Sequence, residues 1–347
     1  MFLDYLFSKF SYDLGIDLGT SNTIVLAVGK GIIINEPTVV AMNKKTKDIL
    51  AIGVEAKRML GKTPDSICVI RPLRAGVVSD FDITYKMLSY FLEKANGFYK
   101  NALRIAKPRV LLGVPSGITE VEHRAVSDAA KNAGARMAFL VEEPLASAVG
   151  AGLEVLQPFG IFMVDIGGGT TEIAVISLGG IVVGKSIKIA GDQFDIAIVE
   201  FAKEEFNLVV GEKTAEECKI AIGNVLSDSE ALKLNFSLRG RDIKTGLPKT
   251  IQVNGVEIKK ALFSPINSLI VAIKDTIEDT PPELIPDIIK QGITLSGGGS
   301  QIKGLVELIS KQTEIKVKCA PEPMNCVAKG CARILEDPVL FKSVRLL

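Results

Sequence analysis

Two acidic residues, each followed by a glycine-rich turn, are the side chains whose types and spacing point most clearly to chemistry. Asp165 follows the apolar run 161–164 and precedes three glycines, Gly167, Gly168 and Gly169, and then Thr170. An apolar run that ends in an acid and glycines is typical of a buried strand followed by a tight turn. Glycines let backbone N–H groups approach a phosphate, and an acid at the strand end can hold a phosphate-bound Mg²⁺, mainly through its water molecules.

The same pattern occurs near the start of the sequence. Asp17 follows a short apolar run and precedes a turn made of Gly19, Thr20, Ser21 and Asn22. Strand-like runs, 24–28 and 173–178, follow the two turns, so the pattern indicates an internal repeat of a phosphate-binding hairpin. Two such hairpins that face each other would clamp a polyphosphate and its metal ion between two lobes.

A third turn, which follows another strand-like run, contains Gly297, Gly298, Gly299 and Ser300. The three turns together resemble the phosphate-1, phosphate-2 and adenosine motifs of the actin/chaperone/sugar-kinase ATPase superfamily. Within it, the chain is most similar to the MreB family of bacterial actins, from about Leu14 to about Leu335. That similarity rests on short segments spread along the chain: Asn35-Glu-Pro37, Gly61-Lys-Thr-Pro64, Ile70-Arg-Pro72, Val114-Pro-Ser-Gly117, Glu142-Glu-Pro144, Ile189-Ala-Gly-Asp192, Thr245-Gly-Leu-Pro248 and Thr280-Pro-Pro-Glu-Leu284.

The resemblance implies an α/β actin-like ATPase fold. Two lobes, each with a ribonuclease-H-like mixed sheet flanked by helices, would hold the nucleotide in the cleft between them. We expect residues 11–150 to form the first lobe, completed by 318–347, and 151–317 to form the second. Smaller subdomains are expected at about 36–76 and about 185–246. The 347 residues are enough for two domains with large cores.

The resemblance also implies slow ATP hydrolysis coupled to filament assembly, with ATP or ADP and Mg²⁺ as cofactors. The two phosphate turns would cradle the phosphates, and Asp17 and Asp165 would hold Mg²⁺. Spacing alone leaves Glu142 and Glu143 as alternatives for the residue that positions or deprotonates the attacking water. The family motif aligns Glu143, next to Pro144, with the active position, where Thr170 would assist it.

Glu216 and Lys219 lie three residues apart within a predicted helix, 214–222. Such a pair commonly forms a solvent-exposed salt bridge on one helix face. The family resemblance favours another interpretation, in which both residues flank the adenosine together with the third glycine turn.

Composition excludes several other classes of protein. The chain has 41 basic and 40 acidic residues, so its charge does not indicate a nucleic-acid-binding protein. Its one histidine, His123, argues against histidine-based metal or general-base chemistry, and its five cysteines form no C-x-x-C pair, which favours reduced thiols in a cytosol. No apolar run reaches the roughly 20 residues that span a bilayer. We therefore expect a cytoplasmic protein, peripheral on the inner face of the cell membrane.

Two segments are predicted to contact that membrane. On a helix, Met1–Phe10 would place its large apolar side chains on one face, as an N-terminal amphipathic membrane-binding helix does; these are Phe2, Leu3, Leu6, Phe7 and Phe10. The alternative is a terminal helix docked on its own domain. The loop 96–105 combines Phe98 and Tyr99 with basic residues, which suits an anionic membrane surface, although inward packing is an equal alternative.

Self-association and partners follow from the resemblance. Val121, on the predicted helix 120–133, would lie at the contact between two antiparallel protofilaments of a homopolymer. The filaments would organise cell-wall elongation and rod cell shape together with membrane proteins such as RodZ, MreC and MreD. The alternatives are an actin-like filament for organelle positioning or plasmid segregation and, less favoured because the chain lacks the insertions of sugar kinases, a small-molecule kinase of the same fold.

Overall fold

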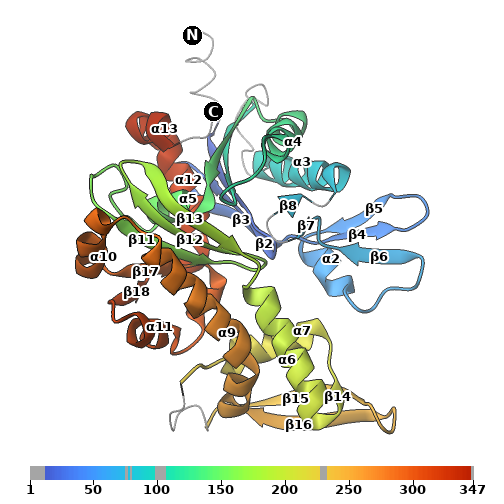
Figure 1. The fold of residues 1–347 in the computed structure, drawn as a ribbon. Coiled ribbons are helices and arrows are strands. Elements are labelled where there is room, and N and C mark those ends of the chain that lie inside the picture. Colours follow the sequence, from blue (N-terminus) through green and yellow to red (C-terminus); the bar gives the residue numbers. More distant parts are fainter. Residues whose placement is uncertain (1–11, 75–76, 79, 98–106, 227–232, 345–347) are drawn as a thin grey trace.

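The two predicted hairpins lie in two five-stranded sheets of identical topology (Figure 1). The computed structural model describes residues 12–74, 77–78, 80–97, 107–226 and 233–344. The first sheet contains β1 (Leu14–Leu18), β2 (Asn22–Ala27), β3 (Gly31–Pro37), β9 (Arg109–Val114) and β10 (Met137–Glu142), in the order β10-β9-β1-β2-β3. The second contains β11 (Ile161–Ile166), β12 (Thr171–Ser177), β13 (Gly180–Ile187), β17 (Ile293–Ser296) and β18 (Val317–Cys319), in the order β13-β12-β11-β17-β18.

Each large sheet joins an antiparallel meander of three strands to two parallel strands. The register of the strand pairs shows that the two hairpins correspond residue by residue. Leu18 pairs with Thr23 across the first hairpin, and Ile166 pairs with Thr171 across the second. The turns 19–22 and 167–170 therefore occupy equivalent positions, which confirms the internal repeat expected from the sequence.

Helices and shorter strands surround these sheets. The helices are α2 (Val54–Met59), α3 (Phe81–Gly97), α4 (Glu120–Asn132), α5 (Glu143–Gly150), α6 (Gly191–Phe206), α7 (Glu212–Ile222), α9 (Gly255–Glu278), α10 (Ile285–Gln291), α11 (Leu305–Thr313), α12 (Cys326–Glu336) and α13 (Pro338–Val344). The 3₁₀ helices are η1 (Pro282–Leu284), η2 (Gly298–Gln301) and η3 (Pro323–Asn325). The remaining strands are β4 (Val40–Asn43), β5 (Ile49–Ile52), β6 (Ile67–Ile70), β7 (Leu73–Arg74), β8 (Val77–Val78), β14 (Leu208–Val209), β15 (Asn235–Asp242) and β16 (Pro248–Asn254).

Each lobe carries one small three-stranded sheet. In the first lobe, the order is β5-β4-β6, with α2 packed beside it. These elements lie within 36–76, and the subdomain boundary there stays a prediction. In the second lobe, the order is β14-β15-β16. The turn 243–247 lies inside the β15–β16 hairpin, which continues to Asn254. Since strands of one hairpin fold together, we propose that the second small subdomain extends to Asn254, past the boundary expected at about 246.

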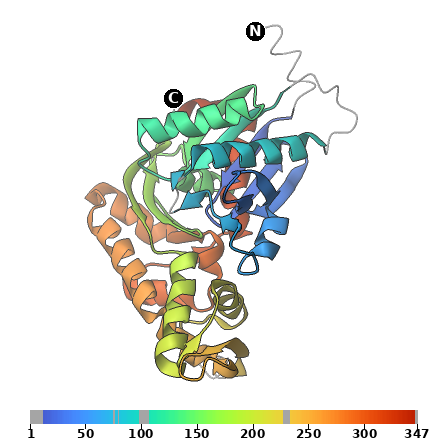
Figure 2. The ribbon, with the colours of Figure 1, turned by 90° about the vertical axis from the view of Figure 1, so that its right-hand side faces the viewer.

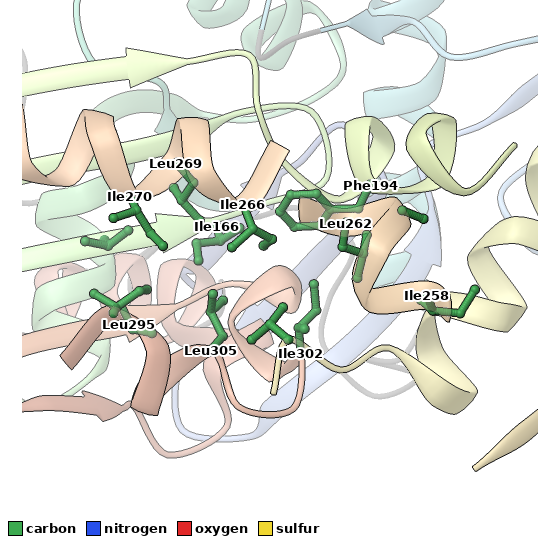
Figure 3. Packing of buried hydrophobic residues seen from close by; sticks show 14 of the residues in the cluster. Ile166, Phe194, Ile258, Leu262, Ile266, Leu269, Ile270, Leu295, Ile302 and Leu305 are labelled. Carbon is green, nitrogen blue, oxygen red and sulfur yellow. The ribbon is translucent and has the colours of Figure 1, made fainter. Parts of the chain in front are cut away.

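The core of the second lobe forms between its sheet and α9 (Figure 3). Ile258, Leu262 and Ile266 recur at intervals of four residues and belong to this buried cluster; Figure 3 shows Leu262 next to Phe194 of α6. The sequence suggested a helix beginning at Pro265. In the structure α9 begins ten residues earlier in the chain, at Gly255, because the Asn254 side chain accepts hydrogen bonds from Val256 and Glu257 N–H groups in a capping box.

The first lobe is covered by α3 and α4, which lie side by side on its sheet (Figure 2). Val121 of α4 is 77% exposed, so it is available for a contact with another molecule. His123 is half-buried instead of exposed as expected, and its Nε2 has no hydrogen-bond partner among the described residues. The C-terminal segment, for which the sequence indicated no role, forms α13, and its Phe341 packs edge-on against Phe139 at a centroid distance of 4.8 Å.

The two lobes are joined by α5 and α12, which cross between the large sheets (Figure 1). α5 follows β10 and α12 follows β18, so the crossing helices occupy equivalent places in the repeat. A Cβ atom on Gly150 would lie 1.9 Å from the Cys326 carbonyl oxygen, and one on Gly330 would lie 1.7 Å from that of Ala146. Glycine is therefore required at both positions, because the two helix backbones are in direct contact.

The predicted membrane segments lie outside the described residues. Met1–Phe10, with Phe2, Leu3, Leu6, Phe7 and Phe10, and the loop residues Phe98 and Tyr99 therefore stay predictions. Within the described ranges, no helix is both long enough and apolar enough to span a bilayer.

Candidate active site

A cavity of about 470 Å³ lies between the lobes, and almost every predicted site residue lines it. The first lobe contributes Asp17, Gly19, Thr20, Ser21, Asn22 and Glu143; the second contributes Asp165, Gly167, Gly168, Gly169, Thr170, Glu216, Lys219, Gly297, Gly298 and Gly299. Ser300 is the exception. It is buried behind the third turn, where its hydroxyl donates a hydrogen bond of 2.7 Å to the Gly297 carbonyl and does not line the cavity.

The two phosphate-type turns touch each other across the cavity. A Cβ atom on Gly168 would lie 2.1 Å from Ser21 Oγ, and a Cβ on Gly169 would lie 2.7 Å from Thr20 Oγ1. Side chains at these two positions would therefore push the lobes apart. The glycines leave room for the Ser21 and Thr20 side chains of the opposite turn, as expected for a cradle that encloses a small anionic group.

Carboxyl groups gather at the floor of this cradle. Burial, and then the nearby charge of Asp165, raise the pKa of Asp17 to about 8. Burial also raises the pKa of Asp165 to about 6, against the opposing effect of hydrogen bonds from Ser147 and Ser296. The Ser147 hydroxyl, on α5, lies 3.0 Å from Asp165 Oδ2. Asp17 and Asp165 are therefore held close together, at the ends of β1 and β11, without enough positive charge nearby to balance them.

Glu143 belongs to the same cluster, and Glu142 does not. Glu143 opens α5, is half-buried and lines the cavity. Loss of hydration, then the charges of Glu172, Asp17 and Asp165, raise its pKa well above the ordinary range. Glu142 ends β10, and its carboxylate accepts a hydrogen bond from the backbone of Gly117 outside the cavity. The structure thus separates the two neighbours that spacing alone left as alternatives.

Glu172 connects the phosphate turn of the second lobe to the first lobe. Its carboxylate accepts hydrogen bonds from the Ser116 backbone N–H (3.2 Å) and the Ser186 hydroxyl (2.7 Å), and it is hydrogen-bonded to the side chain of Thr170. Thr170 is thus fixed at the cavity wall by a buried neighbour. Glu172 was not among the residues singled out from the sequence. In the structure it pairs directly with Asp165 across the two strands.

Glu216 and Lys219 both line the cavity, but they do not pair with each other as a surface salt bridge would. Lys219 Nζ lies 2.8 Å from Asp195 Oδ1 and also donates to the Gly191 carbonyl. Glu216 instead pairs with Lys57 of the first lobe at 2.9 Å. Each of the two residues therefore links α7 to another element at the cavity wall.

Sequence reasoning missed part of the lining. Two of the missed residues, Gly191 and Asp192, lie at the start of α6, within the Ile189–Asp192 segment that supported the family resemblance but received no role. The lining residues not singled out are Leu18, Ile24, Gly191, Asp192, Asp195, Ile220, Gly223, Gln301, Ile302, Lys303, Pro323, Met324 and Val327. Most of these residues are apolar or glycine. Ile302, Pro323 and Met324 lie beside the third turn, which gives that end of the cavity apolar surface suited to a flat ring.

The donor set fits a polyphosphate that arrives with a divalent cation. Of the cavity-lining residues, six are acids and two are lysines, so a bare anion would be repelled while a cation-neutralised one would not. The described part of the chain holds no group of three or more His, Cys, Asp or Glu side chains arranged as a metal-binding cluster. Asp17 and Asp165 could hold a hydrated Mg²⁺ through its water molecules. Mg²⁺ usually keeps several water ligands and binds phosphate oxygens as well.

Comparison with known proteins places this geometry in a family. The family described as "MreB/Mbl protein" matches residues 11–343 of the chain. The chain belongs to the MreB/Mbl family. Cell shape-determining protein Mbl of Bacillus subtilis (strain 168) is 46% identical over 330 residues, which cover 94% of this chain and 97% of that protein. Cell shape-determining protein MreB of Escherichia coli (strain K12) is 44% identical over 331 residues, which cover 94% of each chain.

Solved structures support the actin-like fold of this MreB/Mbl family member. MreB5 of Spiroplasma citri bound to ADP superposes with a TM-score of 0.89 at 35% identity, over 96% of this chain and 98% of that one. The MamK double helical filament superposes with a TM-score of 0.78 at 22% identity, over 94% of this chain and 99% of that one, a likeness that shows the fold alone. The predicted fold class, with two lobes and mixed sheets flanked by helices, is confirmed.

Proposed function

We propose that this MreB/Mbl family member is an ATP-dependent cytoskeletal protein that assembles into membrane-associated filaments and organises cell-wall elongation and rod shape. The proposal rests on one observation: two equivalent glycine turns, each preceded by an aspartate at a strand end, meet in a cavity between the lobes. The relatives from Bacillus subtilis and Escherichia coli are named for cell shape, which supports the cellular role.

The cavity provides separate places for the parts of an adenine nucleotide. Gly19–Asn22 and Gly167–Gly169 would hold the phosphates by backbone N–H groups, and Asp17 and Asp165 would hold Mg²⁺ through its water shell. Glu216, Lys219 and Gly297–Gly299 would flank the adenosine, with Ser300 fixing the third turn from behind. The titles of two Spiroplasma citri MreB5 structures name ADP and AMPPNP as their ligands, which supports this assignment.

Glu143 would act on the water that attacks the terminal phosphate. Hydrolysis needs a water in line with the breaking bond, and a carboxylate can orient that water or accept its proton. Bound Mg²⁺ would neutralise negative charge on the phosphates and the carboxylates. Thr170, held by Glu172, would keep the opposite wall of the cavity in place. Neither phosphate turn contains a lysine or histidine, so Glu143 is the candidate to accept the proton. The family resemblance implies slow turnover.

Assembly and membrane attachment complete the proposal. Val121 exposes an apolar side chain on α4 and would contribute to an antiparallel pair of protofilaments. Phe2, Leu3, Leu6, Phe7 and Phe10, with Phe98 and Tyr99, would hold the filaments on the inner face of the cytoplasmic membrane. There they would meet elongation proteins of the RodZ, MreC and MreD type.

The proposal is tested by high-speed pelleting of the purified protein with Mg²⁺-ATP and without nucleotide. We expect more polymer with Mg²⁺-ATP, and loss of both nucleotide binding and turnover in the Asp165→Ala variant. Depletion in the source cells, followed by imaging, should give rounded cells. Unchanged ATPase activity in Asp165→Ala would remove the site assignment, and unchanged cell shape would remove the cellular role.

A further inference from the structure

Two ion pairs join the lobes at the edge of the cavity. Arg71 Nη1 of the first lobe lies 2.7 Å from Asp192 Oδ1 of the second, and Lys57 Nζ lies 2.9 Å from Glu216 Oε1. The partners are 121 and 159 residues apart in the chain, so only the closed arrangement of the lobes brings them together. The Arg71–Asp192 pair joins two of the family-type segments, Ile70–Pro72 and Ile189–Asp192.

The acidic partner of each pair belongs to the cavity wall. Asp192 and Glu216 line the cavity, and the basic residues reach them from α2 and from the end of β6. α2 lies directly opposite α7 in both views of the fold (Figures 1 and 2). Separating α2 from α7 would therefore break the pairs and open that side of the cavity.

The electrostatic surroundings strengthen the Arg71 contact. Burial lowers the pKa of Arg71, but the charge of Asp192, its hydrogen bond, and the charges of Glu212 and Glu216 together raise it. Arg71 thus faces three acids of the second lobe, carried by α6 and α7. Its removal would leave Asp192 without its partner from the first lobe, and Lys57 at Glu216 would be the remaining ion pair of the two.

The opposite side of the cleft is joined in a different way. At α5 and α12 the backbones are in contact through Gly150 and Gly330 and are surrounded by buried apolar side chains, an arrangement that resists separation. The four ion-pair side chains, in contrast, are 28–34% exposed, so water and salt reach them. Opening should therefore pivot at the crossing helices and break the ion pairs.

We propose that Arg71–Asp192 and Lys57–Glu216 form a clasp that holds the cleft closed and limits the rate at which nucleotide leaves. Arg71 and Lys57 are positioning residues in this role, because they act through acids of the cavity wall. The inference rests on the proposed nucleotide site. It adds that the two ion pairs control the rate of nucleotide exchange, a role that nucleotide binding alone does not require.

The test is the release of a fluorescent ADP analogue from the Mg²⁺-loaded full-length protein, followed by stopped-flow mixing with excess unlabelled ATP. Arg71→Gln and Lys57→Gln should each speed release roughly two- to fivefold, the range for a partly exposed ion pair. The double variant should release faster than either single variant, but not by the simple product of the two effects, because Glu216 faces both cations and couples them. Arg71→Lys, which keeps the charge, should restore most of the wild-type rate.

The matched control is Arg58→Gln. Arg58 is the neighbour of Lys57 on α2, but it pairs at 2.7 Å with Glu55 of the same helix, so its loss should leave release unchanged. Raising NaCl from about 0.1 M to about 1 M shortens the Debye length from about 10 Å to about 3 Å. Release from the wild type should accelerate with salt, and release from the double variant should respond much less, a difference that a merely structural role would not produce.

The outcomes separate the clasp from the site on which it rests. If the wild type binds the analogue but both single variants release it at the wild-type rate with the wild-type salt response, the clasp is overturned and the site stands. If the wild type binds no analogue in the presence of Mg²⁺, the proposed site and the clasp fall together. Lys57→Gln, on a solvent-exposed helix, keeps the test decisive if Arg71→Gln does not fold.

Discussion

At the scale of single residues, neighbours in the chain have different roles because they face different surroundings. Glu142 and Glu143 are both acids at the junction of β10 and α5, but only Glu143 reaches the cavity. The N-terminal end of a helix favours negative charge, whereas burial and three nearby carboxyl groups oppose it at Glu143. A cation that neutralises the cluster would therefore also favour the ionised form of Glu143, the form that can accept a proton from water.

Glu143→Ala should bind Mg²⁺-ATP about as tightly as the wild type and hydrolyse it about 10² to 10⁴ times more slowly. The reason is that a group acting on the attacking water contributes to the transition state more than to the bound ground state. Phosphate release under single-turnover conditions is the measurement, and Glu142→Ala is the matched control. A slow Glu142→Ala with a normal Glu143→Ala would reverse the assignment.

The carboxyl cluster also predicts how stability depends on pH. The pKa is about 8 for Asp17 and about 6 for Asp165 and Asp195, against about 3.9 for an aspartate in an unfolded chain. Between about pH 4 and pH 8 the folded protein therefore binds more protons than the unfolded chain. The free energy of unfolding should fall as pH rises through this window.

Thermal melts of metal-free and nucleotide-free protein across that pH window measure this effect. Asp17→Asn should show a weaker dependence than the wild type, because it removes the group with the largest upward pKa shift among the three. Mg²⁺-ADP should also reduce the dependence by supplying positive charge. Wild-type stability that rises steadily from about pH 5 to pH 8 would contradict the described burial of the cluster.

At the scale of elements, the crossing of α5 and α12 is the contact that the rest of the fold depends on. Gly150 and Gly330 make it possible, since each stands where a Cβ would overlap a backbone carbonyl of the other helix. Overfilling a packed site typically costs about 1–3 kcal/mol. Because these contacts are backbone contacts, the neighbouring side chains cannot relieve them by changing rotamer.

Gly150→Ala and Gly330→Ala should therefore each lower the free energy of unfolding by about 1–3 kcal/mol or more. Gly211→Ala is a suitable control, because a Cβ there meets nothing within 4 Å and its φ is −81°. Urea titration followed by circular dichroism gives the comparison. Wild-type stability in both crossing variants would show that the helices are less tightly packed than described.

The sequence predicted features that depend on residues close together in the chain, and it missed contacts between residues that are far apart in the chain. Asp17 and Asp165 were found because apolar runs and glycines stand next to them in the chain. The capping box at Asn254 and Glu257 was overlooked in favour of Pro265, so α9 was expected to be shorter. Arg71–Asp192 and Lys57–Glu216 join residues more than a hundred positions apart, and no local pattern reveals such pairs. Ser300 was assigned to the site because the sequence pattern of its turn was recognised. Its side chain is instead hydrogen-bonded to the Gly297 carbonyl and does not line the cavity.

At the scale of the whole molecule, the structure consists of two similar halves that face each other across the cavity. Two sheets of the same topology place equivalent turns opposite each other, and equivalent helices join them at the base. A ligand held by both halves stabilises the closed arrangement in proportion to its preference for it. Any surface formed by both lobes, including a filament contact, would then respond to the ligand.

The predicted membrane face belongs to this scale too. Deleting Met1–Phe10 and introducing Phe98→Ser and Tyr99→Ser should abolish liposome co-sedimentation while polymer pelleting without lipid persists. Burying a Phe or Leu side chain contributes about 1.5–3 kcal/mol, and a filament multiplies the contribution of each subunit. Full pelleting of the combined variant with liposomes would place the membrane face elsewhere. Failure to polymerise without lipid would make the N-terminal segment structural.

The most direct test of the central claim is a filament structure determined on lipid with Mg²⁺ and a non-hydrolysable ATP analogue. We expect the phosphates to lie between Gly19–Asn22 and Gly167–Thr170, and Glu143 to lie within about 2.6–3.2 Å of an ordered water. Asp17 and Asp165 should lie at the hydrated metal ion. A nucleotide bound outside this cavity, or filaments whose cavity is empty at saturating analogue, would contradict it.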